Sequence, residues 1–229
     1  QLSASDGEIV TNQSIQVDVT DVDPEGPVFT SSSSFNADEN QTDIGTVAAE
    51  DPFGEVVTYS LSGTDADSIS IDSSSGVLTF NSGPDFETKS SYLIIVTAIG
   101  SIANTEEDIT VNINNLNDNS PVISGTSTYS ADENQTSIGS IAASDADGDS
   151  LTYSVTNSDL SISSEGVLTF ITSPDYESVS VYSAMITVSD GVYSDTKNIT
   201  ININNLNDNS PVFTSNATYS VSENQTSVG

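Results

Sequence analysis

The sequence repeats itself at intervals of 90 to 94 residues, and this periodicity constrains the fold more than any other feature. Residues 115–122 (NLNDNSPV) return without a single change at residues 205–212. Residues 39–42 (ENQT) return at 133–136 and again at 223–226. Self-similarity at a fixed period is typical of chains built from copies of one structural unit.

The repeated motifs divide the chain into two complete repeats with a partial repeat on either side. Residues 76–80 (GVLTF) return at 166–170 with an offset of 90, whereas the earlier motif has an offset of 94. Four extra residues of the first repeat therefore precede residue 76, and we place them in the polar loop 62–68. We predict C-terminal strands of a preceding repeat and a linker at 1–26, complete repeats at 27–120 and 121–210, and the first strand of a following repeat at 211–229.

Within each repeat, apolar and polar residues alternate with a period of two. Ile109, Val111 and Ile113 are separated by polar residues, as are the three isoleucines at 199, 201 and 203. Alternation of this kind indicates half-buried strands, and no stretch has the periodicity of an amphipathic helix. About seven short strands in a repeat of this size predict an all-β fold of tandem β-sandwiches.

The composition limits the possible partners. The chain has 34 acidic residues against two lysines, with a formal net charge of −32, and it lacks His and Cys. Such a charge argues against nucleic acid and anionic membranes as partners, and it favours cations. General solubility remains an alternative explanation of the acidity. The longest apolar run, residues 93–96, is too short to span a bilayer, so we expect no direct membrane insertion by this segment.

Several acidic positions recur with the repeat and offer the oxygen ligands that Ca²⁺ prefers. Two pairs, Asp85 with Glu87 and Asp145 with Asp147, have members two residues apart, so on an extended chain each pair faces one side. Composition and spacing alone do not show that these pairs meet.

The order of the motifs resembles that of the cadherin repeat. In this sequence the order is PVF, Tyr, Glu-Asn, Asp-Ala-Asp, Asp-Tyr-Glu, Asp-Gly and Asn-Asp-Asn-Ser-Pro, and it covers essentially the whole chain. The resemblance implies tandem seven-stranded Greek-key sandwiches of the immunoglobulin-like, cadherin type, joined end to end. It also implies three calcium ions at each joint between successive domains.

The same resemblance assigns the ligands, residue by residue. For the joint between the two complete repeats it implies side chains of Glu39, Asp85, Glu87, Asn117, Asp118, Asp145, Asp147 and Asp190, with carbonyls of Leu116 and Asn119. For the following joint it implies Glu133, Asp175, Glu177, Leu206, Asn207 and Asp208. Asn115 departs from the family's usual Asp, at a position not expected to be a ligand.

The joint before the first complete repeat departs from this pattern. The joint between the two complete repeats, here called the middle joint, has Asp118, Asp147 and Asp190. At the earlier joint these positions are occupied by Pro24, Phe53 and Ile99. None of these three residues can bind calcium through its side chain, so we predict a joint poor in metal. The stretch 65–67 (DAD) resembles residues 145–147, but it falls in the inserted loop, and we interpret it as a solvated loop.

These observations predict a non-enzymatic, calcium-binding extracellular or cell-surface array that acts as a calcium-rigidified spacer or cell-adhesion module. Its partners would be other copies of itself, surface proteins or glycans. The alternatives are a filament subunit that assembles head to tail or by donor strands, and a carbohydrate-binding module of a surface protein. The family's strand-exchange adhesion needs a Trp, which this chain lacks. The acidity and the lack of Cys favour a microbial or viral source.

Overall fold

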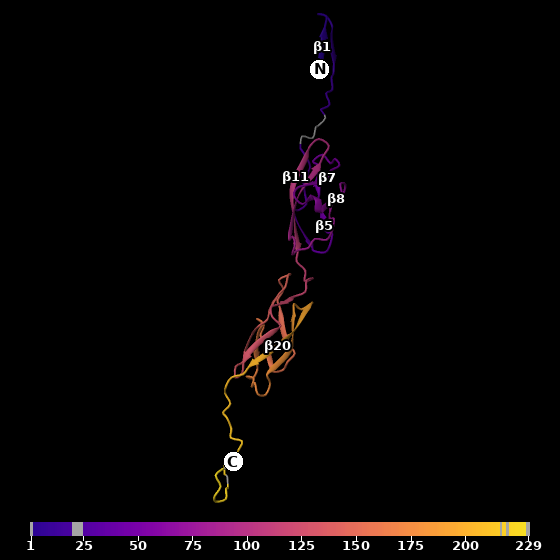
Figure 1. Ribbon diagram of the computed structural model, residues 1–229. Coiled ribbons are helices and arrows are strands. Elements are labelled where there is room, and N and C mark those ends of the chain that lie inside the picture. Colours follow the sequence, from indigo (N-terminus) through magenta and orange to yellow (C-terminus); the bar gives the residue numbers. More distant parts are fainter. Residues whose placement is uncertain (1, 20–24, 216, 219, 228–229) are drawn as a thin grey trace. The chain divides into compact units, whose positions relative to one another are not determined.

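The computed structural model describes residues 2–19, 25–215, 217–218 and 220–227, and every described element except one short 3₁₀ helix is a strand. The all-β prediction is confirmed. The chain forms two compact units, Gln1–Leu116 and Asn117–Gly229 (Figure 1). Within the described residues no helix is long and apolar enough to cross a membrane.

The first unit contains a β-sandwich preceded by a hairpin. The hairpin pairs β1 (Leu2–Ser5) with β2 (Val10–Gln13), and all eight of its residues are exposed. One sheet of the sandwich has the order β4-β11-β10-β7 and the facing sheet β5-β9-β8, with a separate pair β3-β6. The strand bounds are β3 Val28–Phe29, β4 Ser34–Asp38, β5 Asp43–Thr46, β6 Ala49–Glu50, β7 Thr58–Ser62, β8 Ile69–Ile71, β9 Val77–Phe80, β10 Ser91–Ile99 and β11 Asn104–Asn114; the 3₁₀ helix η1 is Ala66–Ser68.

The second unit repeats this topology strand for strand. Its sheets are β13-β20-β19-β16, β14-β18-β17 and β12-β15. The bounds are β12 Val122–Ser124, β13 Thr128–Asp132, β14 Ser137–Ser140, β15 Ala142–Ser144, β16 Thr152–Val155, β17 Leu160–Ile162, β18 Val167–Phe170, β19 Val181–Ser189 and β20 Ser194–Asn204. In both units the first strand of the four-stranded sheet, β4 or β13, lies parallel to the last, β11 or β20, whereas the other pairings are antiparallel.

Each unit has its own hydrophobic core, built from the alternation that the sequence shows. Ile109, Val111 and Ile113 of β11 point inward and are at most 5% exposed. Their equivalents on β20 are buried in the same way. Because each core is made only from residues of its own unit, each sandwich can form its interior without the other.

Glycine is required in the turns before β9 and β18, because the backbone that follows β5 or β14 approaches each turn closely. Gly76 and Gly166 have φ angles of 72° and 78°, in the left-handed region. A Cβ on Gly76 would lie 2.2 Å from the carbonyl oxygen of Val47, and a Cβ on Gly166 would lie 2.4 Å from that of Ile141. The recurrence of GVLTF therefore reflects packing.

The structure refines the place of the insertion in the first repeat. The strand pairings align Leu61 with Val155, and Ile69 with Leu160, so three of the four extra residues lie between β7 and β8. The fourth lies in the turn between β8 and β9, where residues 72–76 stand against residues 163–166. The loop between β7 and β8 contains η1, which has no counterpart in the second unit.

Candidate metal centres

A buried glutamate holds the C-terminal end of the second unit together. Glu133 follows β13 and is 0% exposed. Its Oε1 accepts a hydrogen bond from the backbone N–H of Leu206 at 2.6 Å, and its Oε2 accepts one from Tyr176 N–H at 2.8 Å. Backbone donors of this kind offset the desolvation of a buried carboxylate. Glu133 thereby joins the segment after β20 to the loop before β19.

Glu39 makes the same two bonds in the first unit. It is 1% exposed, and it accepts from Leu116 N–H at 2.7 Å and from Phe86 N–H at 2.9 Å. Both glutamates recur with the repeat, and the cadherin resemblance implied both of them as calcium ligands. The backbone bonds show that each has a structural role in addition to any role with metal.

Two further carboxylates lie beside Glu133. Carboxylate oxygens of Glu133, Glu177 and Asp208 all lie within 4.8 Å of one another, and we call this group the C-terminal cluster. Asn209 Nδ2 donates to Asp208 Oδ1 at 2.8 Å, and Asn205 Nδ2 donates to Glu177 Oε1 at 3.1 Å. The segment after β20 thus supplies one carboxylate and two amides to a group whose buried member, Glu133, follows β13.

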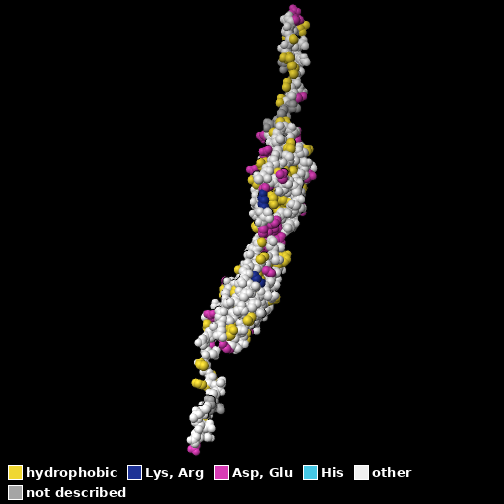
Figure 2. Space-filling view, in the orientation of Figure 1, with side chains coloured by type: hydrophobic (Ala, Val, Ile, Leu, Met, Phe, Trp, Pro, Cys, Tyr) yellow, Lys and Arg dark blue, Asp and Glu magenta, His cyan; other side chains and the backbone are white. Residues whose placement is uncertain are grey.

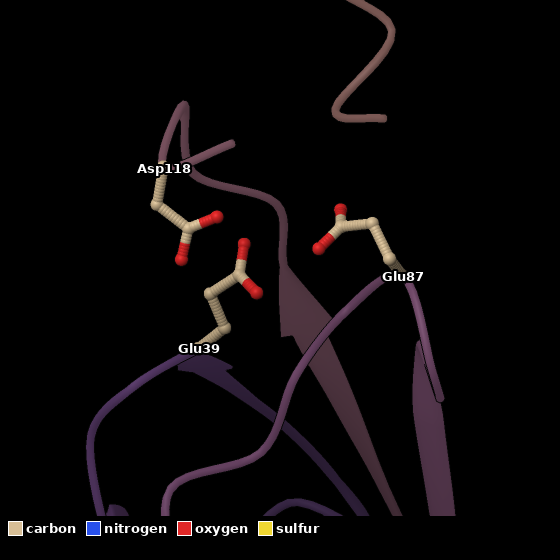
Figure 3. A group of neighbouring side chains, drawn as sticks. All are labelled: Glu39, Glu87 and Asp118. Atoms are coloured by element: carbon tan, nitrogen blue, oxygen red, sulfur yellow. The ribbon is translucent and has the colours of Figure 1, made fainter. Parts of the chain in front are cut away.

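The equivalent residues of the first repeat form a matching group. Oxygens of Glu39, Glu87 and Asp118, which lies in the segment after β11, are within 4.8 Å of one another. Figure 3 shows the three carboxylates turned toward a common space. Three of the ligands predicted for this joint are therefore brought together.

The aspartates Asp85 and Asp175, also predicted as ligands, cap turns. Asp85 accepts hydrogen bonds from the hydroxyl (2.8 Å) and the N–H (3.1 Å) of Thr88. Asp175 accepts from the Ser178 hydroxyl at 2.8 Å and from Glu177 N–H at 3.0 Å. The hydroxyl bond is the leading cause that lowers the pKa of each carboxyl. These carboxylates lie outside the two clusters and are ionised at neutral pH.

A third group of carboxylates lies on the loop after β15 in the second unit. Oxygens of Asp145, Asp147 and Asp149 lie within 4.8 Å of one another. Asp145 Oδ1 accepts the N–H of Asp149 at 3.3 Å, and Gly148 has a φ of 80°. The sequence reasoning missed Asp149, although its position two residues after Asp147 repeats the spacing that selected Asp145 and Asp147.

The segment after Leu116 attaches to this loop. Asp147 Oδ2 accepts hydrogen bonds from the N–H groups of Asp118 at 3.0 Å and Asn119 at 2.9 Å. Asn119 Nδ2 also donates to Asp147 Oδ1 at 2.8 Å. The side chain of Asp147 therefore orders the segment after Leu116 by bonding the backbone of that segment. Asp190 lies in the turn between β19 and β20. Burial opposes ionisation of its carboxyl, but hydrogen bonds from Tyr193, Val192 and the Asn117 amide outweigh that effect and lower the Asp190 pKa.

Three oxygens in this region are buried without a hydrogen-bond donor. They are Asn117 Oδ1, Asp145 Oδ2 and Asp190 Oδ2, and all three belong to residues predicted as ligands. A buried acceptor without a partner costs about 1–3 kcal/mol, and more when it carries charge. A hard cation bound by oxygen would remove that cost, so the donor set fits calcium.

Neither basic side chain of the chain neutralises these groups. Lys89 pairs with Asp65 and lies 4.7 Å from the centroid of the Tyr92 ring. Lys197 Nζ donates to the carbonyl oxygen of Gly125 at 2.6 Å. Figure 2 shows acidic side chains spread over the visible face with few basic ones among them. Of residues 65–67, which were expected to form a solvated loop, Asp65 is paired with Lys89 and partly buried, whereas Asp67 is exposed.

Leu116 and Leu206 present their N–H groups to the buried glutamates, and the Leu206 carbonyl accepts Asp208 N–H at 3.0 Å. Asn207 is exposed. Pro24 lies outside the described residues.

In the loop after β6 of the first unit, Phe53 is 49% exposed. The residue equivalent to Asp190 is Gly100 rather than Ile99, because Gly100 N–H bonds Ala103 O as Asp190 N–H bonds Tyr193 O. This corrects the alignment by one residue. Glycine offers no side-chain ligand, so the expectation of a poor site at that position is unaffected.

Comparison with known proteins gives two kinds of match. Residues 117–202 match the model of a bacterial Ig domain family. Human Protocadherin Fat 4 is 30% identical over 219 residues, which cover 87% of this chain and 4% of that protein. The Drosophila melanogaster Fat-like cadherin-related tumor suppressor homolog is 28% identical, with 92% of this chain and 5% of that protein covered. The chain is cadherin-like.

Solved cadherin structures have the same fold. Human Protocadherin-24 EC1-2 superposes with a TM-score of 0.69 at 19% identity, covering 80% of this chain and 99% of that one. Mouse Cadherin-23 EC22-24 gives 0.67 at 20% identity, covering 82% and 67%. The predictions of a cadherin-like chain and an immunoglobulin-like β-sandwich are confirmed. The relatives named here are cadherins and none is named as an enzyme, and the expected extracellular or cell-surface location agrees with them.

Proposed function

We propose that this cadherin-like segment binds calcium ions at the ends of its sandwiches and thereby serves as a rigid extracellular spacer in cell adhesion. The observation that carries the proposal is electrostatic. Three groups of carboxylates, each within 4.8 Å, occur in a chain whose two lysines are engaged elsewhere. Like charges this close repel, and a divalent cation is the partner of suitable charge and ligand preference.

The separations support this chemistry. Calcium binds oxygens at about 2.3–2.6 Å, so two oxygens on one ion lie at most about 5 Å apart. The limit of 4.8 Å within each group meets this requirement. Calcium would supply positive charge, and the chain would supply ligands and hold them in place. The middle joint would use Glu39, Asp85, Glu87, Leu116, Asn117, Asp118, Asn119, Asp145, Asp147 and Asp190; the following joint would use Glu133, Asp175, Glu177, Leu206, Asn207 and Asp208.

The chain's own contacts explain how such binding would stiffen a joint. Asp118 contributes a carboxylate to the group with Glu39 and Glu87, while its backbone N–H bonds Asp147. One short segment therefore carries ligands and anchors together. Ligands that bind the ordered arrangement better than a loose one shift the equilibrium toward order by mass action. Extracellular modules bind calcium with dissociation constants of about 10⁻⁴–10⁻³ M, so the joint would be rigid outside cells and loose at cytosolic calcium levels.

Calcium content and small-angle scattering of the whole chain test this proposal. We expect several bound ions per chain after dialysis against millimolar calcium, and a larger maximum dimension than in chelator. The doubly substituted variant D118N/D147N should lose most of that change. A matched control is Asp43→Asn and Asp159→Asn together, which alters charge equally outside the three groups. Equal dimensions with and without calcium in the unsubstituted chain would disprove the rigid-spacer proposal.

A strand-donating assembly is a second candidate, and the segment after β20 favours it. Val212 and Phe213 are 83% and 95% exposed, whereas Ile123, at the position equivalent to Phe213, is 8% exposed in its own unit. We propose that residues 211–215 add to strands of a further repeat, in the same longer chain or in another copy. Light scattering tests the intermolecular form: deletion of residues 211–229 should abolish any concentration-dependent association, and undiminished association would exclude it.

A further inference from the structure

The asparagine after each buried glutamate adopts an unusual backbone conformation. Asn40, Asn134 and Asn224 have φ angles of 62°, 65° and 69°, and no other described non-glycine residue has a positive φ. Asparagine tolerates this left-handed region better than other residues with side chains. Asn224 adopts it without any described strand around it, so the local sequence favours the turn.

Backbone conformation alone does not explain asparagine at these positions, because glycine would serve as well or better. The side chain of Asn134 supplies the additional reason. Its Nδ2 donates to Asp208 Oδ2 at 2.7 Å, across 74 residues of sequence. Asp208 belongs to the C-terminal cluster, and its other oxygen accepts from Asn209. Asn134 is therefore connected to the cluster although it offers no carboxylate.

We propose that Asn134 is a positioning residue for cation binding at the C-terminal cluster, an inference that rests on the proposed calcium function. Its amide fixes the orientation of the Asp208 carboxylate beside Glu133 and Glu177. A donor on Oδ2 also offsets part of the repulsion among the three carboxylates before a cation arrives. Each carboxylate oxygen has two lone-pair directions, so the amide leaves the oxygen able to bind metal.

The left-handed turn makes this possible. Glu133 points into the protein and bonds the backbone of Leu206 and Tyr176. The reversal at Asn134 lets the next side chain reach the segment after β20, two residues beyond Leu206. Asn40 adopts the same conformation after Glu39, and we assign it the same role in the first repeat.

Two substitutions separate positioning from folding. Asn134→Gly retains the backbone conformation and removes the amide. Asn134→Asp retains the shape and replaces the donor with an acceptor facing Asp208. The matched control is Asn204→Asp, which makes the same charge change and breaks an Asn–Asp bond of 2.9 Å to Asp132, outside the cluster. All four chains would be titrated with Tb³⁺ and with competing Ca²⁺, in a Tyr193→Phe background.

Tyrosine-sensitised terbium emission is selective for this end of the molecule. Tyr176 lies on the loop bonded to Glu133, whereas its equivalent beside Glu39 is Phe86, which does not sensitise terbium emission in the same way. The Tyr193→Phe background removes the tyrosine beside Asp190. Thermal unfolding in chelator provides the second measurement, because loss of a purely structural contact would lower the unfolding temperature even without metal.

We expect both Asn134 variants to bind the ions about 10-fold more weakly or worse, as supporting contacts to metal ligands commonly do. Asn134→Gly should unfold in chelator within a few degrees of the parent, and Asn204→Asp should bind like the parent. Equal affinity of parent and variants, or a loss explained by unfolding in chelator, would overturn the inference. A parent that binds neither ion would instead refute the calcium function itself.

Discussion

The N-terminal loops of the two repeats have one backbone design and different chemistry. In both, an aspartate, Asp51 or Asp145, accepts a hydrogen bond from the N–H four residues later, and a glycine follows at a φ of 77° or 80°. The residue immediately before the glycine is Phe53 in the first repeat and Asp147 in the second. The aspartate and glycine thus suffice to form the turn, and the neighbouring side chain determines whether the loop can bind a cation.

The C-terminal ends show no such divergence. Glu39 and Glu133 are equally buried and bond the same two elements of backbone. The contacts at the C-terminal end are therefore the same in both repeats, whereas the side chains of the N-terminal loops differ. The buried glutamate is a requirement of the fold as well as a candidate ligand.

The largest expected effect comes from removing that glutamate. Glu133→Ala leaves the N–H groups of Leu206 and Tyr176 without their acceptor, and Glu39→Ala does the same to Leu116 and Phe86. We expect each to destabilise its own repeat by about 2–4 kcal/mol in chelator. Chemical denaturation followed by hydrogen exchange would assign the loss to one repeat. The exposed Glu50→Ala is the control, and an effect no larger than the control would show that the glutamates serve metal alone.

The repeat and the period-two alternation predicted the fold, because both can be read from the sequence and the alternation determines which side chains of a strand are buried. The paired strands follow from period two, and the cadherin resemblance gave the positions of Glu39, Glu87 and Asp118, which the structure brings within 4.8 Å. The contacts of Asp85 and Asp175 were harder to predict, because a carboxylate can either cap a turn or bind metal. In the structure each accepts a hydrogen bond from the hydroxyl three residues later.

The role of Asn134 lay beyond sequence reasoning for a different reason. Its partner Asp208 lies 74 residues away, and no local pattern reveals that distance. The pairing of Asp65 with Lys89 was also missed, since it depends on how the inserted loop folds back over β10.

The second prediction concerns a variant in which two aspartates at the N-terminal end of the second repeat are replaced by the residues of the first repeat. The variant Asp147→Phe with Asp190→Gly removes two carboxylates and leaves the turn formed by Asp145 and Gly148. At calcium concentrations 10 to 100 times the dissociation constant, binding stabilises by about 1.4–2.7 kcal/mol per site, and we expect the variant to lose a gain of that size. Unfolding of parent and variant, each with calcium and with chelator, measures it. An undiminished calcium effect would place binding elsewhere.

The third prediction concerns the inserted loop. In the first repeat Asp65 bonds Lys89 and Leu93 N–H, whereas in the second repeat Val179 stands at the position of Lys89, and the loop is held by Asn157 Nδ2, which donates to the Ser183 carbonyl oxygen. The side chain of Asp65 is 12% exposed and that of Lys89 is 41% exposed, so the pair is partly screened by solvent. We expect a coupling of about 0.5–1 kcal/mol in a double-mutant cycle of D65N and K89V, decreasing at high salt. Zero coupling at low salt would contradict a pair that orders this loop.

The smallest effect should appear as a difference in pH dependence between the turns before β9 and β18. Asp72 accepts the N–H and hydroxyl groups of Ser75 and Ser74, which lower its pKa well below the usual range. In the second repeat Ser163, which does not titrate, caps the equivalent turn by accepting the N–H groups of Glu165 and Val167.

A lowered folded-state pKa means that the stabilisation by Asp72 is complete above its unfolded pKa of about 3.9 and is lost as the pH falls toward the folded value. We therefore expect Asp72→Asn to reduce stability at pH 6 and to have less effect at pH 2.5, with the difference confined to the first repeat. The Ser163 hydroxyl also donates to Glu165 Oε2 at 2.9 Å, so the comparison uses a Glu165→Gln background, which removes the titrating carboxylate. In that background Ser163→Ala should destabilise the second repeat equally at both pH values. Urea denaturation at the two pH values, resolved by hydrogen exchange, measures both variants. A pH-independent effect of Asp72→Asn would mean that the ionised carboxylate caps this turn no better than a neutral side chain does.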